Sequence, residues 1–397
     1  MASFNSTIPD LASDPPLPLS PIAFGAATFS TCYNDEATLE SEVPEQTLLR
    51  ALRSGLCNAI DTSPYYGNSQ TILGSILSKP HVRAEFPRSS YHLLTKCGRY
   101  GARVQDFDYS SVRLRQSVNE SCELMQTSYL DVVYLHDVEF VAESVGDANA
   151  GGQAEFTTND EILSRRGLAA DQVKVCWGPG DQVIIEAVKT LFELKAEGKI
   201  KKVGISGYPL PTLLRLSRLI SVTLERPLDF LMSYAHHTLQ NDALVSFVPA
   251  FRQAGVRQIV NASPLSMGLL RDVGPQDWHP APPELRAAST EASRVCKEIY
   301  QTTLERVSLG FGFGGFDLEP THCANRTVVI GCGNVQEVDE SMTVWSELYG
   351  PISSAKDNTD QSMSTEQRLK QKSAEVDVRK VFVDAGFANW SWPTPLE

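Results

Sequence analysis

The sequence contains no apolar run that approaches the length of about 18 residues needed to cross a membrane. Positive charge is also scarce, because 35 Lys and Arg face 48 Asp and Glu and leave a formal net charge of −13. Nucleic acids and anionic membranes attract clustered Lys and Arg, so we expect neither as a partner. The first residues lack the basic start and the long apolar stretch of a secretory signal, so we expect a cytoplasmic protein.

Paired cysteines are absent as well. The eight cysteines are scattered, with no Cys-x-x-Cys pair and no Cys/His group at the spacing of a zinc site. We therefore expect free thiols and no bound metal. The hydrophobic fraction of 42% and the charged fraction of 21% are those of an ordinary globular protein, and they leave the oligomeric state open.

Three apolar segments each run directly into an ionisable residue. The segment N-A-I-D ends at Asp61, L-L-T-K ends at Lys96, and Y-L-D-V-V-Y-L-H ends at His136. A carboxylate that follows buried apolar residues is costly unless it is paired, so Asp61 requires a cation from elsewhere in the chain. Taken alone, Asp61 could equally cap a helix beside the Pro-Gly turn that follows it.

The order of the segments favours one fold. Helical patterns separate the apolar segments, and eight strand-helix pairs can be counted over residues 21–350. We therefore predict an α/β fold with a single (β/α)8 TIM barrel, in which strand C-termini meet on one face and bring the three ionisable groups together. The other expected parts are a flexible Pro/Ser-rich arm over residues 1–20, an insertion over 139–181 and a tail over 351–397 with a helix over 367–385.

Several boundaries carry expectations of their own. The insertion follows the fourth strand, so we expect a lid or a substrate wall on the catalytic face, with a neutral surface excursion as the alternative. The first strand is expected over 22–26 and the seventh helix over 285–309. Apolar residues recur about every 3.6 positions after Ser110 and predict a helix with one buried face: Val112, Leu114, Val118, Cys122, Leu124 and Met125.

The segments I-D-T-S-P-Y-Y-G, L-L-T-K and Y-L-D-V-V-Y-L-H resemble the active-site motifs of the aldo-keto reductases. Carried over residue by residue, the resemblance implies a catalytic tetrad of Asp61, Tyr66, Lys96 and His136. Lys96, held by Asp61, would lower the pKa of Tyr66 from its usual value of about 10. Tyr66 would then exchange a proton with the substrate, and His136 would hydrogen-bond the reacting oxygen.

The resemblance also implies a nicotinamide cofactor. The segment V-I-G-C-G-N-V-Q-E-V-D-E-S resembles the part of the family that holds the adenosine half, although a glycine loop before a helix is by itself only an anion site or a capped turn. Gly207, Ser233 and Ala262 stand where the family usually has Asn, Gln and Tyr. The expected cofactor contacts are Thr28, Ser206, Gly207, Ser233, Ser263, Pro264, Leu265, Ile330, Gly331, Cys332, Gly333, Asn334, Glu337, Glu340 and Ser341.

Two positions favour NAD over NADP. The Lys and Arg with which the family holds the 2′-phosphate correspond here to Gly331 and Glu337. A phosphate would find no cation there and would be repelled by Glu337, whereas a ribose hydroxyl can donate a hydrogen bond to that carboxylate. We therefore expect NAD.

The remaining pattern looks most like the sugar dehydrogenase branch of the family, which holds L-galactose dehydrogenase and the fungal D-arabinose dehydrogenases. It implies oxidation of an aldose at C1 to the lactone. The expected substrate contacts are Phe29, Tyr65, His136 and Asp137. Asp137 and the neighbouring Glu139 would accept hydrogen bonds from sugar hydroxyls, with a solvated loop as the alternative, and Phe29 and Tyr65 would form an apolar wall. Phe29 and Tyr65 could instead be core residues. The alternatives are an NADP-dependent carbonyl or aldehyde reductase and a nicotinamide-binding sensor with little turnover.

Overall fold

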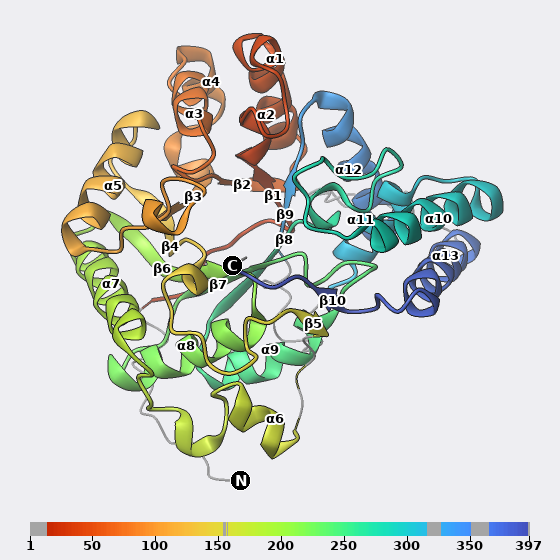
Figure 1. Ribbon diagram of the computed structural model, residues 1–397. Coiled ribbons are helices and arrows are strands. Elements are labelled where there is room, and N and C mark those ends of the chain that lie inside the picture. Colours follow the sequence, from red (N-terminus) through yellow and green to blue (C-terminus); the bar gives the residue numbers. More distant parts are fainter. Residues whose placement is uncertain (1–13, 154–155, 157, 316–326, 351–364, 396–397) are drawn as a thin grey trace.

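A computed structural model describes residues 14–153, 156, 158–315, 327–350 and 365–395. Its centre is a closed barrel of parallel strands in the order β1-β2-β3-β4-β6-β7-β8-β9, surrounded by helices (Figure 1). The predicted (β/α)8 TIM barrel is therefore confirmed. The barrel strands are β1 Ile22–Gly25, β2 Cys57–Asp61, β3 His92–Cys97, β4 Leu130–Leu135, β6 Ile200–Gly207, β7 Phe230–Tyr234, β8 Gln258–Ala262 and β9 Val328–Gly331.

Helices cover the outside of the barrel, and their ends follow local sequence signals. The Ser110 side chain accepts a hydrogen bond from the Arg113 backbone at the start of α5, and Asn334 does the same for Glu337 at the start of α12. The helices are α1 Glu36–Glu40, α2 Val43–Arg53, α3 Ser69–Leu77, α4 Pro80–Glu85, α5 Ser111–Leu124, α6 Asp160–Arg165, α7 Pro179–Ala196, α8 Leu210–Thr223, α9 Ala243–Gln253, α10 Pro283–Tyr300, α11 Leu304–Phe313, α12 Val335–Tyr349 and α13 Thr365–Asp384.

The barrel interior is a packed core and not a channel. Small residues such as Ala23 and Ala59 share it with the large rings of Tyr134 and Phe230. Gly204 makes room for these rings, since a Cβ atom at that position would lie 2.7 Å from a Tyr134 ring carbon. A reacting molecule can therefore enter only above this core, at one end of the barrel.

The base of the barrel is closed by the N-terminal arm. Leu17 and Leu19 are buried, and the Leu17 backbone N–H donates to the Gln258 side chain at 2.7 Å. The expected flexible arm is thus wrong for residues 14–20, because two leucines in a Pro-rich segment gave no periodic signal. Residues 1–13 lie outside the described part of the chain. Asp14 completes the closure by pairing with Lys195, Lys202 and Arg257.

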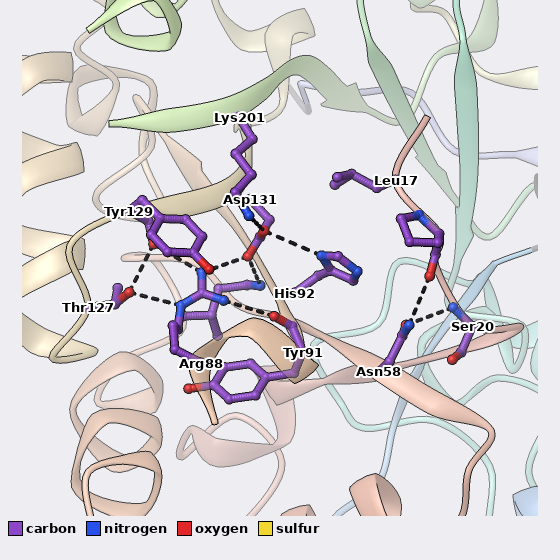
Figure 2. Close-up of polar contacts among 12 residues, drawn as sticks. Leu17, Ser20, Asn58, Arg88, Tyr91, His92, Thr127, Tyr129, Asp131 and Lys201 are labelled. Carbon is purple, nitrogen blue, oxygen red and sulfur yellow. Dashed lines mark hydrogen bonds and ion pairs between the residues drawn. The ribbon is translucent and has the colours of Figure 1, made fainter. Parts of the chain in front are cut away.

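A second polar cluster at the base joins β3, β4 and β6 (Figure 2). Buried Asp131 accepts hydrogen bonds from Arg88 at 2.6 Å and Lys201 at 2.9 Å, and from the Leu93 backbone at 2.9 Å. Burial by itself would raise the pKa of Asp131, but these donors and His92 hold it well below its usual value. The cluster lies at the opposite end of β4 from His136, so we assign it to stability and not to chemistry.

The insertion and the tail meet each other at the other end of the barrel. Strand β5, Gly152–Gln153, pairs antiparallel with β10, Trp390–Ser391. In Figure 1 the chain leaves α13, runs past this pair and ends near the centre of the view along the barrel. The sequence predicted neither strand, because two residues are too few to show an alternating pattern.

The insertion is also more firmly packed than its composition indicates. Val145 and Leu168 are buried, and buried Asp181 at the start of α7 pairs with Arg215 of α8 at 2.5 Å. The weak periodicity of residues 139–181 was therefore a poor guide to their burial. The Asp181–Arg215 pair fixes the insertion to α8.

Three local expectations were wrong. Strand β1 ends at Gly25, and Ala26–Phe29 form a 3₁₀ turn. The single helix expected over residues 285–309 is interrupted at Gln301, which takes a left-handed φ of 54°, and Thr303 then caps α11. On α5, Val112 and Leu124 are exposed, whereas Ser117 and Ser121 are buried in their place, because these small hydroxyl residues suit the close contact with neighbouring elements.

Candidate active site

The four tetrad side chains meet at the C-terminal end of the barrel. Lys96 Nζ on β3 donates to Asp61 Oδ1 at the end of β2 over 2.6 Å, and to the Thr62 carbonyl over 3.1 Å. The same Nζ lies 4.7 Å from the centre of the Tyr66 ring, and that ring lies 5.8 Å from the His136 ring. The parallel strands thus place these groups together as the sequence predicted.

Burial dominates the electrostatics of this cluster. The side chains of Asp61 and Lys96 are 4% and 2% exposed. Burial raises the pKa of Asp61, and Lys96 opposes that rise. For Lys96 itself burial acts downward, but the charge of Asp61 prevails and raises its pKa. The ammonium is thus kept charged next to the phenol.

The expectation for Tyr66 needs a correction. Its pKa is raised and not lowered, because burial disfavours the phenolate more than Lys96 favours it. Lys96 does act in the predicted direction, but the sequence could not show that the protein packed around the phenol outweighs it. Tyr66 is therefore a protonated phenol at neutral pH before any further positive charge enters the site.

His136 is held from both sides. Its Nδ1 lies 3.0 Å from Ser63 Oγ, and its Nε2 lies 3.6 Å from Asp137 Oδ2. Burial, together with Lys96 and Arg99, lowers the pKa of His136 well below its usual value. The imidazole is therefore neutral and has one donor and one acceptor nitrogen.

Arg99 is a site residue that the sequence did not reveal. Its guanidinium pairs with Asp137 and lies 3.8 Å from the centre of the Tyr65 ring. Phe107 and Phe140 stack on each other beside it, with ring centres 4.7 Å apart. Arg99 follows β3 by two positions, and no motif marked it, because its partner on the next strand end becomes visible only in the fold.

The expected substrate contacts separate into two groups. Asp137 and half-buried Tyr65 lie beside His136, and the Tyr65 ring centre is 5.9 Å from that of His136. Phe29 instead packs in the core against Phe24, at 5.3 Å, so its alternative as a core residue holds. Glu139 is buried too.

Glu139 serves the backbone and not the mouth of the site. Its Oε1 accepts a hydrogen bond from the Tyr208 N–H at 3.0 Å. Its Oε2 lies 2.4 Å from where a Cβ atom of Gly207 would be, so a side chain at position 207 would displace the carboxyl. The expectation that Glu139 binds sugar hydroxyls is therefore wrong, since the carboxyl fills the space that a side chain at 207 would occupy.

The residues expected around the nicotinamide half end three neighbouring strands. Ser206 is the penultimate residue of β6 and its Oγ donates to the Leu135 carbonyl at 3.2 Å, and Ser233 on β7 contacts His236 Nδ1 at 3.3 Å. Ala262 ends β8, and its methyl group lacks the aromatic ring that the family usually has at this position. The turn that follows it contains Ser263, Pro264 and Leu265, and Ser263 has a left-handed φ of 57°.

The expected adenosine-binding loop lies between β9 and α12. Thr28 donates to the Cys332 carbonyl at 2.9 Å and so joins this loop to the turn after β1. The sequence of the loop places Ile330 and Gly331 at the strand end, and Gly333 and Asn334 at the N-terminus of a long helix. Backbone N–H groups and the helix dipole there suit an anionic group.

Three residues of α12 behave differently from one another. Glu337 Oε2 accepts from the Gly333 N–H at 2.8 Å, so it shapes the loop. Glu340 pairs with Arg306 of α11 at 2.7 Å, and buried Ser341 donates to the Glu337 carbonyl at 2.8 Å. Glu340 and Ser341 therefore have partners within the protein, and their contact with a cofactor stays a prediction.

A groove of about 250 Å³ lies next to this loop. Arg271 lines it, and its guanidinium is 3.7 Å from Glu337 Oε1. The sequence gave no sign of this cation, which lies outside the loop that carries Glu337. An open groove, a helix N-terminus and exposed Gly331 together fit an elongated, partly anionic cofactor. The groove is lined by Tyr33, Met267, Gly268, Arg271, Val273, Gly274, Pro275 and Gln276.

The tail packs against residues that follow β6 and β7. The Trp392 ring stacks on Tyr208, which follows β6, with ring centres 3.9 Å apart and an angle of 15°. Tyr208 in turn lies 4.3 Å from His236, which follows β7. The insertion is thus joined to the tail, about 240 residues further along the chain, and its role as a lid or substrate wall stays a prediction.

Among the residues that the structure describes, no group of three or more His, Cys, Asp or Glu side chains is arranged to hold a metal ion. Within the same residues no helix is both long enough and apolar enough to span a membrane. The seven cysteines in the described ranges are free thiols, and Cys323 lies outside those ranges.

Comparisons with known proteins agree with this geometry. The sequence profile described as "Aldo/keto reductase family" matches residues 21–353. The chain is 37% identical over 292 residues to D-arabinose 1-dehydrogenase of Saccharomyces cerevisiae, covering 73% of this chain and 72% of the yeast protein. It is 30% identical over 336 residues to L-galactose dehydrogenase of Arabidopsis thaliana, covering 84% and 86%.

Solved structures support the fold alone. A glycerol dehydrogenase from Gluconobacter oxydans aligns with a TM-score of 0.56 and 18% identity, over 100% of this chain and 98% of its own. An aldo-keto reductase from Bacillus halodurans aligns with a TM-score of 0.54 and 18% identity, over 91% and 95%.

Proposed function

Because the chain belongs to the aldo/keto reductase family, we propose that it oxidises an aldose at C1 to the aldonolactone with NAD as the hydride acceptor. The observation that carries the proposal is the convergence of Tyr66, Lys96 and His136 at the mouth of the barrel. The names of the yeast and Arabidopsis relatives, which are both sugar dehydrogenases, support the class of substrate.

Each site residue has a definite part in this reaction. Nicotinamide, when bound in its oxidised form, accepts the hydride and adds a positive charge to the site. Tyr66 first releases its own proton to water and forms the phenolate that Lys96 favours; this phenolate then takes the proton of the C1 hydroxyl and becomes a neutral phenol again. His136 donates a hydrogen bond to the same oxygen. As hydride and proton leave, the C1–O single bond becomes the lactone carbonyl.

The polar surroundings of His136 suit a sugar better than a simple aldehyde. Asp137 pairs with Arg99, and its Oδ2 lies 3.6 Å from His136 Nε2. A hydroxyl on the carbon next to C1 can donate to that carboxylate, whereas an alkyl aldehyde would leave the buried pair without the contact. The expected preference is therefore for polyhydroxylated substrates.

The choice of NAD rests on Glu337. Its carboxylate holds Gly333 and neutralises Arg271, so a 2′-phosphate would meet a negative charge and an occupied cation. The residues that would hold the two ends of the cofactor are Gly333 and Asn334 at the helix N-terminus and Ser206, Ser233 and Ser263 at the strand ends.

The test is a spectrophotometric scan of aldoses with NAD and with NADP. We expect growth of the reduced-coenzyme absorbance with NAD and with D-arabinose or L-galactose type sugars. Coenzyme binding without turnover of any sugar would favour a sensor, and faster reduction of simple aldehydes with NADPH would favour a carbonyl reductase. Either result would contradict the proposal.

A further inference from the structure

The neutral ring of His136 can serve the reaction in only one of its two tautomers. Its Nδ1 faces Ser63, and its Nε2 faces Asp137 and the mouth of the site. With the proton on Nε2, the ring can donate a hydrogen bond to a reacting oxygen. With the proton on Nδ1, Nε2 would instead present a lone pair to that oxygen and repel it. Something must therefore select the tautomer.

The hydrogen bonds of Ser63 make that selection. Ser63 is fully buried in the turn after β2, and its Oγ already accepts the Tyr65 N–H at 3.0 Å. Within the described residues, its other partner is His136 Nδ1, also at 3.0 Å. If Nδ1 carried the proton, Oγ would accept twice and its own O–H would be buried without an acceptor, which is unfavourable.

We propose that Ser63 is a positioning residue that donates its hydroxyl proton to His136 Nδ1 and so keeps the imidazole proton on Nε2. Asp137 favours the same tautomer, because its carboxylate faces the Nε2–H side at 3.6 Å. The assignment of the tautomer stands on these contacts alone. Its use, donation to the oxygen at C1, rests on the function proposed above.

Nitrogen NMR of the whole protein with isotope-labelled histidine tests the tautomer directly. The chain has seven histidines, and His136 is assigned by the signals lost in His136→Gln. We expect His136 at neutral pH to show a protonated Nε2 and an unprotonated Nδ1. A protonated Nδ1 with a bare Nε2, or an imidazolium, would overturn the proposal. This measurement needs neither substrate nor turnover.

Ser63→Ala then removes the selecting hydroxyl. We expect the Nδ1 resonance to move toward mixed tautomers and kcat to fall about tenfold, the usual effect of one hydrogen bond, while the Kd for NAD changes less than about twofold. Ser63→Cys, which keeps a weak donor of similar size, should recover part of the loss. Unchanged tautomer and kcat in Ser63→Ala would refute the role of Ser63.

Ser69→Ala is the matched control. Ser69 is equally buried at the start of α3, directly after the same turn, but its hydroxyl bonds Thr62 at 2.7 Å and not His136. We expect the His136 signals and kcat to stay at wild-type values in this variant, so a similar loss there would assign the effect to general loosening of the turn. If no sugar is oxidised while the tautomer is as expected, the function proposed above fails and the assignment of Ser63 stands.

Discussion

Replacing Lys96 by Met should destabilise the protein in a pH-dependent way, because it leaves Asp61 buried without its cation. Within the described residues, Lys96 is the cation that pairs with Asp61, at 2.6 Å, and Asp61 Oδ2 has no hydrogen-bond partner. Breaking such a buried pair from one side costs about 3 to 5 kcal/mol. For a chain of this length we expect a fall in Tm on the order of 5 °C.

The sign of the pH dependence follows from the carboxyl. Burial already raises the pKa of Asp61 in the folded protein, and loss of Lys96 removes the charge that opposes this rise. A group with a raised folded pKa contributes stability below its unfolded value of about 3.9 and loses it as the pH rises toward the folded value. The difference in Tm between Lys96→Met and the wild type should therefore be small at pH 5 and larger at pH 8.

A double-mutant cycle measures the pair. Asp61→Asn combined with Lys96→Met removes both charges, so we expect the double variant to be more stable at pH 8 than Lys96→Met alone. Lys202→Met is the control, because Lys202 is also buried but its partner Asp14 keeps Lys195. Equal stability of the single and the double variant at pH 8, with parallel pH profiles, would refute the reasoning.

Three further outcomes are expected. Tyr66→Phe should keep the fold and the NAD affinity but lower kcat by about 10² to 10⁴, as steady-state kinetics and coenzyme titration will show, and near wild-type turnover would exclude Tyr66 as the acid–base group. Glu337→Arg should raise kcat/KM with NADP relative to NAD by removing the negative charge beside Arg271, and no gain would mean that the 2′-position does not lie there. Trp392→Ala should raise the KM for sugar about tenfold and leave the Kd for NAD unchanged. Trp278→Ala is the control, because its ring is exposed and its loss should leave the KM for sugar unchanged. Equal effects of the two substitutions would count against a wall role for Trp392.

The fold and the centre of the site could be predicted because their signals are local. Asp61, Lys96 and His136 each end an apolar strand, and parallel strands bring such ends together whatever the helices between them do. Tyr66 follows at a fixed distance in a short turn. Predicting the strand order and the strand ends therefore required only the sequence near each residue.

The remaining features depend on pairs of residues that are distant in sequence. Arg99 and Asp137 become partners only when β3 and β4 are adjacent. Burial reversed the expected pKa shift of Tyr66, and burial is a property of everything packed around the ring. The sequence indicated that Glu139 is a polar residue at a strand end, but its carboxyl is buried in the space that the absent side chain of Gly207 leaves.

The pairing of β5 with β10 has a consequence for the order in which the protein is completed. A nascent chain leaves the ribosome from its N-terminus, so Gly152 is available long before Trp390 and Ser391 have been made. Until those late residues arrive, Gly152 has no strand to pair with and Tyr208 has no Trp392 ring to stack on. The tetrad residues, which end at His136, are thus made long before the segment that joins the insertion to the tail.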